Sequence, residues 1–138
     1  MNIDSIQNGI VIDHISAGQG MKLYELLDLE DLDCSVALIK NVASKKLGRK
    51  DIIKIDAQIP VNLDIIGYVD PDATVNIIRD GILVEKKGIK LPERLTNVLK
   101  CKNPRCITST EQELDHVFKL MDPAKKIYRC IYCEARSK

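Results

Sequence analysis

The first ninety positions of the chain contain short runs of aliphatic and β-branched residues, separated by polar or glycine-containing segments. Short apolar runs that are bounded by turn-forming residues are typical of β-strands. The runs predict strands at residues 9–15, 35–42, 52–55, 74–79 and 82–87. The last two flank Asp80-Gly81, a dipeptide that favours a two-residue hairpin turn.

Two further segments are candidates for helices. Between residues 21 and 29 the apolar side chains recur three and four positions apart, which predicts an amphipathic helix. Residues 61–69 are ambiguous, because Gly67 and the β-branched residues disfavour a helix whereas the order of the elements favours one. That order predicts an α+β fold of the ferredoxin-like type, in which helices lie on one face of an antiparallel sheet.

A domain boundary is predicted near Leu91-Pro92-Glu93, where the strand and helix patterns stop and a cysteine-containing segment begins. Proline favours an extended conformation in the residue before it, so Pro92 suits a connecting segment. We therefore expect two domains, residues 1–91 and residues 92–138. Domains this small bury a low fraction of their surface and call for a further source of stability, such as a metal ion or a subunit contact.

Four of the five cysteines form two close pairs, Cys101 with Cys106 in a C-x4-C pattern and Cys130 with Cys133 in a C-x2-C pattern. Each pair brings two thiolates together in a turn, and two such pairs complete the tetrahedral ligand set of a zinc site. Four thiolates leave no open position for a water molecule, so the site is expected to be structural rather than catalytic. The pattern predicts a small β-rich zinc-ribbon domain with one Zn²⁺ per chain.

Other interpretations of the cysteines stay open at this point. An iron site uses the same four ligands, and two disulfides are a further alternative. His116 lies between the two pairs, and a lone histidine there is expected to be packed or solvated rather than a further ligand. Cys34 has no partner nearby in the sequence and is expected to be a small core residue.

The composition limits the classes of protein that fit. With no Trp and one Phe, the core must be aliphatic and few side chains can stack on nucleic-acid bases. The formal net charge is +1, and from Lys100 onward nine Lys and Arg face five Asp and Glu, an excess that a tetrathiolate zinc site lowers by two charges. A zinc-ribbon nucleic-acid-binding protein remains the alternative, supported by Tyr128, Arg129 and Tyr132 beside the second cysteine pair.

The sequence also bears on the cellular compartment. No apolar run reaches the length of a membrane span, and the first residues lack the basic and apolar regions of a signal peptide. Clustered cysteines in such a chain indicate a reducing compartment, where thiols bind metals more often than they form disulfides. We expect the protein to be cytoplasmic.

Several short segments occur together, in order, across nearly the whole chain. They are Gly-Ile-Val-Ile-Asp-His-Ile at residues 9–15, Gly-Arg-Lys-Asp-Ile-Ile-Lys-Ile at residues 48–55, Ala-Thr-Val-Asn-Ile-Ile at residues 73–78, Leu-Pro-Glu-Arg-Leu-Thr-Asn-Val-Leu at residues 91–99 and the two cysteine pairs. In this combination the chain resembles the regulatory chains of aspartate carbamoyltransferase (aspartate transcarbamoylase).

The resemblance implies a non-catalytic allosteric subunit that acts in pyrimidine biosynthesis. Its N-terminal domain is expected to bind nucleoside triphosphates, with the pyrimidine end products CTP and UTP competing with ATP for one effector pocket. Its zinc domain is expected to contact the catalytic chains, which form trimers. The chain is also expected to pair with itself as a regulatory dimer, and neither nucleic acid nor a membrane is expected as a partner.

The resemblance further implies which residues bind the effector. His14 and Lys86 are expected on the phosphates. Lys50 is a further candidate cation for that side of the pocket because of its charge, and not because of the resemblance. Asp13 is expected to accept a hydrogen bond from a ribose hydroxyl, and Lys54 is expected to donate one to the ribose.

Three more residues are assigned to the pocket by the same resemblance. Asn76 is expected beside the triphosphate. Ile6 and Ile10 are expected at the base end of the pocket, where backbone groups make many of the contacts that recognise the base.

The chain departs from the better-known members of the family at Gly81, where they carry an aromatic residue close to the base. It departs again over residues 56–72, which are shorter and poorly matched.

Without the resemblance these residues carry little weight. Lysines are ordinarily solvated surface residues, and an Asp-His pair in a regular strand points one side chain to the core and the other away from it. That alternation also disfavours a small nucleotide-using enzyme, because Asp13 and His14 are its single candidate catalytic pair and cannot easily share a substrate.

Overall fold

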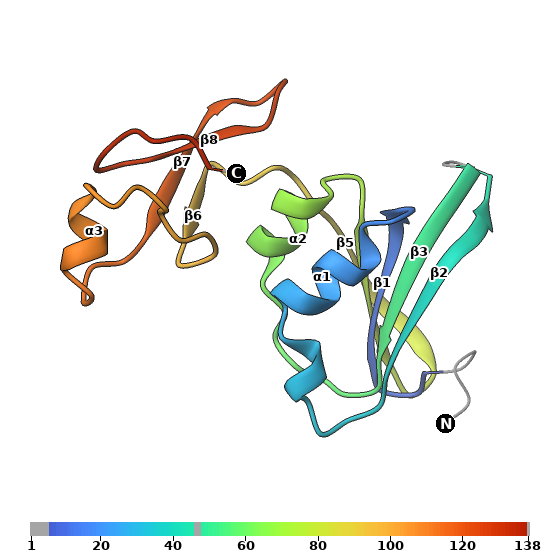
Figure 1. Cartoon of the computed structure of the whole chain (residues 1–138). Coiled ribbons are helices and arrows are strands. Elements are labelled where there is room, and N and C mark those ends of the chain that lie inside the picture. The colour runs from blue at the N-terminus through green and yellow to red at the C-terminus, as the bar shows by residue number, and fades with distance from the viewer. Residues whose placement is uncertain (1–5, 46–47, 138) are drawn as a thin grey trace. The chain divides into compact units, whose positions relative to one another are not determined.

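The computed structural model describes residues 6–45 and 48–137 (Figure 1). The chain divides into two compact units, Met1–Lys90 and Leu91–Lys138. The first five residues, on which the expectation about a signal peptide depends, lie outside the described part. Among the residues that are described, no helix is long and apolar enough to cross a membrane.

The first unit contains a five-stranded antiparallel sheet in its described residues. Its strands are β1 (Gly9–Ser16), β2 (Val36–Ser44), β3 (Gly48–Ile55), β4 (Thr74–Arg79) and β5 (Ile82–Gly88). They lie in the order β2-β3-β1-β4-β5. The first four strands have the ferredoxin-like order, and the β4–β5 hairpin adds one strand at the edge. The predicted α+β class is therefore confirmed.

Two helices, α1 (Gly20–Leu26) and α2 (Leu63–Val69), lie side by side on one face of this sheet (Figure 1). The sheet residues that face them are aliphatic and fully buried, as are Leu23 of α1 and Ile66 of α2. The core of the unit is this layer between helices and sheet, and removing its apolar surface from water is the main source of stability. The opposite face of the sheet, which we call the open face, carries no helix among the described residues.

Both helices differ from a simple periodic pattern. α1 is shorter than the predicted 21–29, because Asp28 takes a left-handed conformation (φ 53°) and a 3₁₀ turn over Leu29–Asp31 follows. The ambiguous segment forms α2, and the side chain of Asn62 caps it by accepting hydrogen bonds from two backbone N–H groups. Gly67 is required there for space, since a Cβ atom would lie 2.2 Å from the Lys90 carbonyl oxygen.

Asp51 is a buried carboxylate that ties three segments of the first unit together. Among the described residues it accepts hydrogen bonds from the backbone N–H groups of Gly18 (3.0 Å), Gly20 (2.9 Å) and Asn41 (2.9 Å). Its side chain is 1% exposed. One acidic group thus fixes the loop that leads into α1 and the irregular part of β2.

The second unit contains a three-stranded antiparallel sheet in the order β6-β7-β8. Its elements are β6 (Arg94–Thr96), α3 (Ile107–Thr110), β7 (Val117–Asp122) and β8 (Ile127–Cys130). Its apolar core is small, with Leu95, Phe118 and Tyr128 as the large buried side chains among the described residues. The Tyr128 hydroxyl donates a hydrogen bond to the Pro92 carbonyl oxygen (2.6 Å) and so anchors the start of the unit.

We predict that replacing Asp51 by Ala destabilises the protein by about 2–4 kcal/mol, because three backbone N–H groups, one of them buried, lose their common acceptor. Asp56→Ala is the matched control, since Asp56 is exposed and its backbone hydrogen bond to Ser35 survives the change. Urea unfolding followed by circular dichroism measures both variants. Equal, small effects of the two substitutions would contradict the proposed role of Asp51.

Candidate functional site

The four paired cysteines converge at one point of the second unit. Cys101 lies in the loop after β6, Cys106 precedes α3, Cys130 ends β8 and Cys133 lies in the turn after β8. Their sulfur atoms all lie within 4.8 Å of one another. The Cys101–Cys133 and Cys106–Cys130 sulfur distances are 3.5 Å and 3.7 Å.

These distances fit a metal site and not disulfides. Sulfurs in a disulfide are about 2.05 Å apart, whereas tetrahedral Zn–S bonds of about 2.3 Å place their sulfurs about 3.8 Å apart. In the part of the chain that the structure describes, the four cysteines are the single group of side chains close enough to share a metal ion. The donor set fills a tetrahedron completely, so the site fits one structural zinc ion, whose binding holds the four thiolates together.

Polar groups around the sulfurs favour their ionised form. The Thr108 hydroxyl donates to the Cys106 sulfur (3.1 Å), and the Ala135 N–H donates to the Cys133 sulfur (3.5 Å). Burial raises the pKa of Cys133, but hydrogen bonds from Asn103 and Ala135 outweigh burial and lower that pKa to about 6. Burial raises the pKa of Cys101 to about 12. A metal ion must therefore displace protons from part of the cluster.

His116 supports the site from outside it. Its Nδ1 atom accepts the backbone N–H of Cys101 (3.0 Å), so the ring positions a ligand residue and is not itself one of the clustered ligands. His116 is thus a packed side chain, one of the two environments expected for it. Tyr128, which supported the nucleic-acid alternative, is fully buried and cannot stack on a base.

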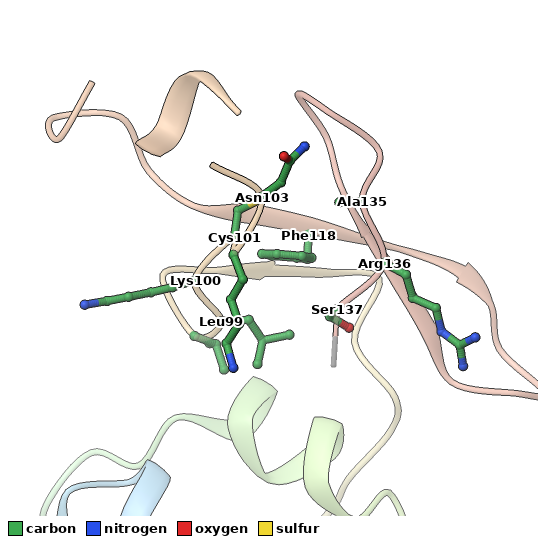
Figure 2. A pocket seen from close by; sticks show the side chains of 10 residues that line it. Leu99, Lys100, Cys101, Asn103, Phe118, Ala135, Arg136 and Ser137 are labelled. Carbon is green, nitrogen blue, oxygen red and sulfur yellow. The ribbon is translucent and has the colours of Figure 1, made fainter. Parts of the chain in front are cut away.

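A hollow of about 380 Å³ lies beside Cys101, between the segment that leads to it and residues 135–137. Figure 2 shows Phe118 at its centre, with the side chains of Lys100 and Arg136 extending away from it in different directions. The two cations do not converge on the hollow, so we assign no ligand to it.

The predicted effector residues lie mainly on the open face of the first unit. Lys54, Val11, Asn76 and Lys86 are consecutive partners across β3, β1, β4 and β5. Residues that are directly opposite in an antiparallel sheet share a face. Their neighbours along the strands are core residues, so this row points away from the helices and spans four strands.

A β-bulge brings Asp13 and His14 onto the same face. Ile12 and Ile15 are both 0% exposed, and the pairing of β1 with β3 shifts between them. His14 has a φ of 57°, and its Nδ1 atom lies 3.1 Å from the hydroxyl of Thr74, the in-register partner of Asp13. The expectation that the two neighbours point to opposite faces is wrong, because the bulge adds a residue to the alternation.

Asp13 is paired with Lys50 in this structure. The ammonium nitrogen and the carboxylate oxygen are 2.9 Å apart, and both side chains are half-buried. Burial raises the pKa of Asp13, but the Lys50 ammonium and the His14 backbone N–H act in the opposite direction, and the pKa ends below its usual value. Asp13 is thus an ionised acceptor beside the Lys50 ammonium and the His14 backbone N–H.

Asn76 carries a polar atom that is not satisfied within the described part of the chain. Its Oδ1 atom is buried and accepts no hydrogen bond there. Buried polar atoms are nearly always hydrogen-bonded, so an exception in this position fits a donor from outside the chain.

Ile6 and Ile10 are placed differently. Ile10 is 4% exposed and lies in the core under the helices, on the other side of the sheet from Lys86. Ile6 is also buried, and its side chain packs next to Gly9. The side chain of Ile10 therefore does not line the open face, and Ile10 offers that face backbone groups alone.

Sequence reasoning missed two residues near this face. Thr74 holds the His14 ring, and Gln7 accepts the backbone N–H of Gly81 through its carbonyl oxygen (2.9 Å). Gly81 itself has a φ of 76°, so a side chain there is strained. Thr74 lies in the 73–78 segment and Gln7 in none of the matched segments. The contacts of both residues depend on how the strands pair, which the sequence does not display.

The fold and the sites define a small binding protein, with a structural metal unit and a separate unit whose sheet gathers cations on one face. Comparisons with known proteins agree. Residues 1–90 match the family model of the aspartate carbamoyltransferase regulatory chain, allosteric domain, and residues 93–138 match its metal binding domain. A regulatory chain from Clostridium tetani is 49% identical, with 97% of this chain and 94% of the relative aligned.

Two further relatives carry the same description. A chain from Clostridium botulinum is 48% identical over 97% of this chain and 92% of its own, and one from Bifidobacterium longum is 44% identical over 100% and 99%. The chain belongs to the family of aspartate carbamoyltransferase regulatory chains. It is therefore a regulatory, non-catalytic subunit with an allosteric domain and a metal-binding domain.

We predict that Cys106→Ser removes the metal ion and unfolds the second unit, because the metal's binding energy is the folding energy of so small a core. Cys34→Ser, in the first unit, is the control and should keep one ion per chain. Elemental analysis of the purified variants measures the ion content. Retention of a full equivalent of metal by Cys106→Ser would rule out the four-cysteine site.

Zinc affinity should fall as pH falls, because protons and the metal compete for the same sulfurs. The loss should steepen below pH about 6, where Cys133 also becomes protonated in the metal-free cluster. Competition with a chelator across this pH range measures whether zinc affinity falls as the pH falls. An affinity that does not change with pH would contradict the ligand assignment.

Proposed function

We propose that the chain binds nucleoside triphosphates of the CTP, UTP and ATP class on the open face and transmits their binding to the catalytic chains of aspartate carbamoyltransferase, in pyrimidine biosynthesis. The catalytic chains are bound as trimers by the zinc unit. The protein acts as a regulatory dimer in the cytoplasm.

The observation that carries the proposal is the gathering of complementary groups on one face of the sheet. A triphosphate needs several cations, and Lys86 and His14 lie on the open face with Lys50. A ribose needs an acceptor and a donor, and Asp13 and Lys54 lie on neighbouring strands of that face.

Further groups of the site fit the same ligand. The unsatisfied oxygen of Asn76, in register with Lys86, suits a donor group of the nucleotide. The Asp13–Lys50 ion pair uses one N–H of the ammonium, and both groups keep further donor and acceptor positions for a nucleotide. The tip of the β4–β5 hairpin, held by Gln7 and Asn8, forms the neighbourhood of the base.

Coupling to the catalytic chains requires two states of the assembly. An effector shifts their equilibrium only if it binds one state more tightly than the other, and catalytic ligands then change its affinity by the same factor. In our proposal residues 91–99 connect the effector face to the zinc unit, which holds the catalytic chain. The edge strand β5 supports the proposed pairing of the chain with itself. An edge strand leaves backbone groups free to pair with another chain, and β5 also exposes the apolar side chains of Ile82, Leu83 and Val84.

Replacing Lys86 by Ala should weaken binding of CTP, UTP and ATP by about 10- to 100-fold, the range expected for one charged hydrogen bond. Lys87→Ala is the matched control, because Lys87 is the next residue of β5 but pairs with Val75 and faces the helix side. Isothermal titration measures the affinities. The proposed pocket is wrong if the two variants bind nucleotide equally well.

The assembly is tested by sedimentation of the metal-loaded chain with catalytic trimers from the same source. We expect a large complex that a thiol-blocking mercurial dissociates, because the reagent takes the cysteines from the metal. Lys86→Ala should assemble like the natural chain. If the natural chain forms no complex, the proposed partner is wrong, and binding of nucleic acid becomes the next measurement.

A further inference from the structure

Three cations lie in one row across the sheet of the second unit. Arg94 on β6 is directly opposite Lys119 on β7, and Lys119 is directly opposite Arg129 on β8. The adjacent row, Leu95, Phe118 and Cys130, is buried at 0%, 2% and 1% exposure. Because side chains alternate along a strand, the three cations point away from that core, to the outer surface.

This arrangement is unfavourable for the unit by itself. Like charges that are directly opposite on neighbouring strands repel one another. The ion pairs found among the described residues are Asp13–Lys50 and Glu85–Lys87, so none of the three cations has a carboxylate partner there. The row therefore fits a surface whose charge is balanced by something outside the chain.

The cation row lines a groove of about 600 Å³ that also exposes apolar side chains. Met121 and Ile131 line it and are 55% and 40% exposed. Glu134 is the single carboxylate among its described lining residues, and its backbone oxygen accepts a hydrogen bond from Arg129 (3.0 Å). That bond fixes the Arg129 guanidinium at the edge of the groove.

We propose that this groove docks a carboxylate-bearing patch with an apolar centre on the surface of the catalytic chain. The inference rests on the proposed function and adds the face and the chemistry of the contact. Exposed Met and Arg are the residue types that are enriched in protein interfaces. Complementary charge then sets the orientation of docking and its rate more than the total affinity.

A protein partner fits this groove better than nucleic acid does. No aromatic side chain lines it among the described residues, and single-stranded nucleic acid relies on aromatic stacking. Met121 and Ile131 would lie against phosphates in such a complex, where they gain nothing. Carboxylates that surround an apolar patch match both features of the groove.

Lys119→Glu is the test variant, because Lys119 is the middle member of the row and is exposed. Lys125→Glu is the matched control, with the same change of charge at an exposed position in the turn between β7 and β8. Lys119→Gln removes the charge without reversing it. It is the milder change, so it keeps the test valid if Lys119→Glu fails to fold. Metal content and nucleotide affinity should be unchanged in all three variants.

Binding to catalytic trimers is measured by sedimentation at several salt concentrations. Lys119→Glu should weaken assembly by about 10-fold or more at low salt, Lys119→Gln by less, and Lys125→Glu by less than about 3-fold. The difference should shrink as salt increases, because the contact is electrostatic.

The outcomes separate this inference from the proposed function. No assembly by the natural chain would reject the proposed partner itself. Normal assembly by Lys119→Glu, with the natural chain also assembling, would overturn the docking face alone. Salt-dependent binding of DNA or RNA that Lys119→Glu abolishes, with assembly unchanged, would assign the groove to nucleic acid instead.

Discussion

The second unit depends on one constraint, the convergence of four cysteine sulfurs on a single point. Its apolar core contains few large side chains, and such a core seldom supplies enough stability for an independent unit. Cys101 and Cys106 come from the segment before β7, whereas Cys130 and Cys133 come from the end of the sheet. A structural metal ion links these segments, so the fold of the second unit depends on a loaded site.

In the first unit, the polar groups of the open face depend on an irregularity in the central strand, β1. The bulge at Asp13 and His14 places two neighbouring polar side chains on the open face while Ile12 and Ile15 keep their places in the core. The buried carboxylate of Asp51 holds the loop that follows. A carboxylate, an imidazole and several ammonium groups thereby share one surface, which is the chemistry that a nucleoside triphosphate requires.

Much of this organisation could be predicted from the sequence. The strands follow from apolar runs, and the cysteine spacing predicted a metal cluster that the structure contains. The end of α1 could not be predicted, because Asp28 adopts a left-handed conformation that no glycine signals. The bulge and the row of cations on β6, β7 and β8 were also missed, since the bulge depends on the register between β1 and β3 and the row on the register between β6 and β7, strands that are far apart in the chain.

In the function that we propose, nucleotide binding to this chain changes the activity of another polypeptide. The most direct test is aspartate saturation of the reconstituted complex, measured with and without CTP or ATP. We expect a nucleotide to shift the aspartate concentration for half-maximal rate in the complex and to have no effect on catalytic trimers alone. Unchanged saturation in the complex, with the nucleotide shown to be bound, would rule out a regulatory role for nucleotide binding to this chain.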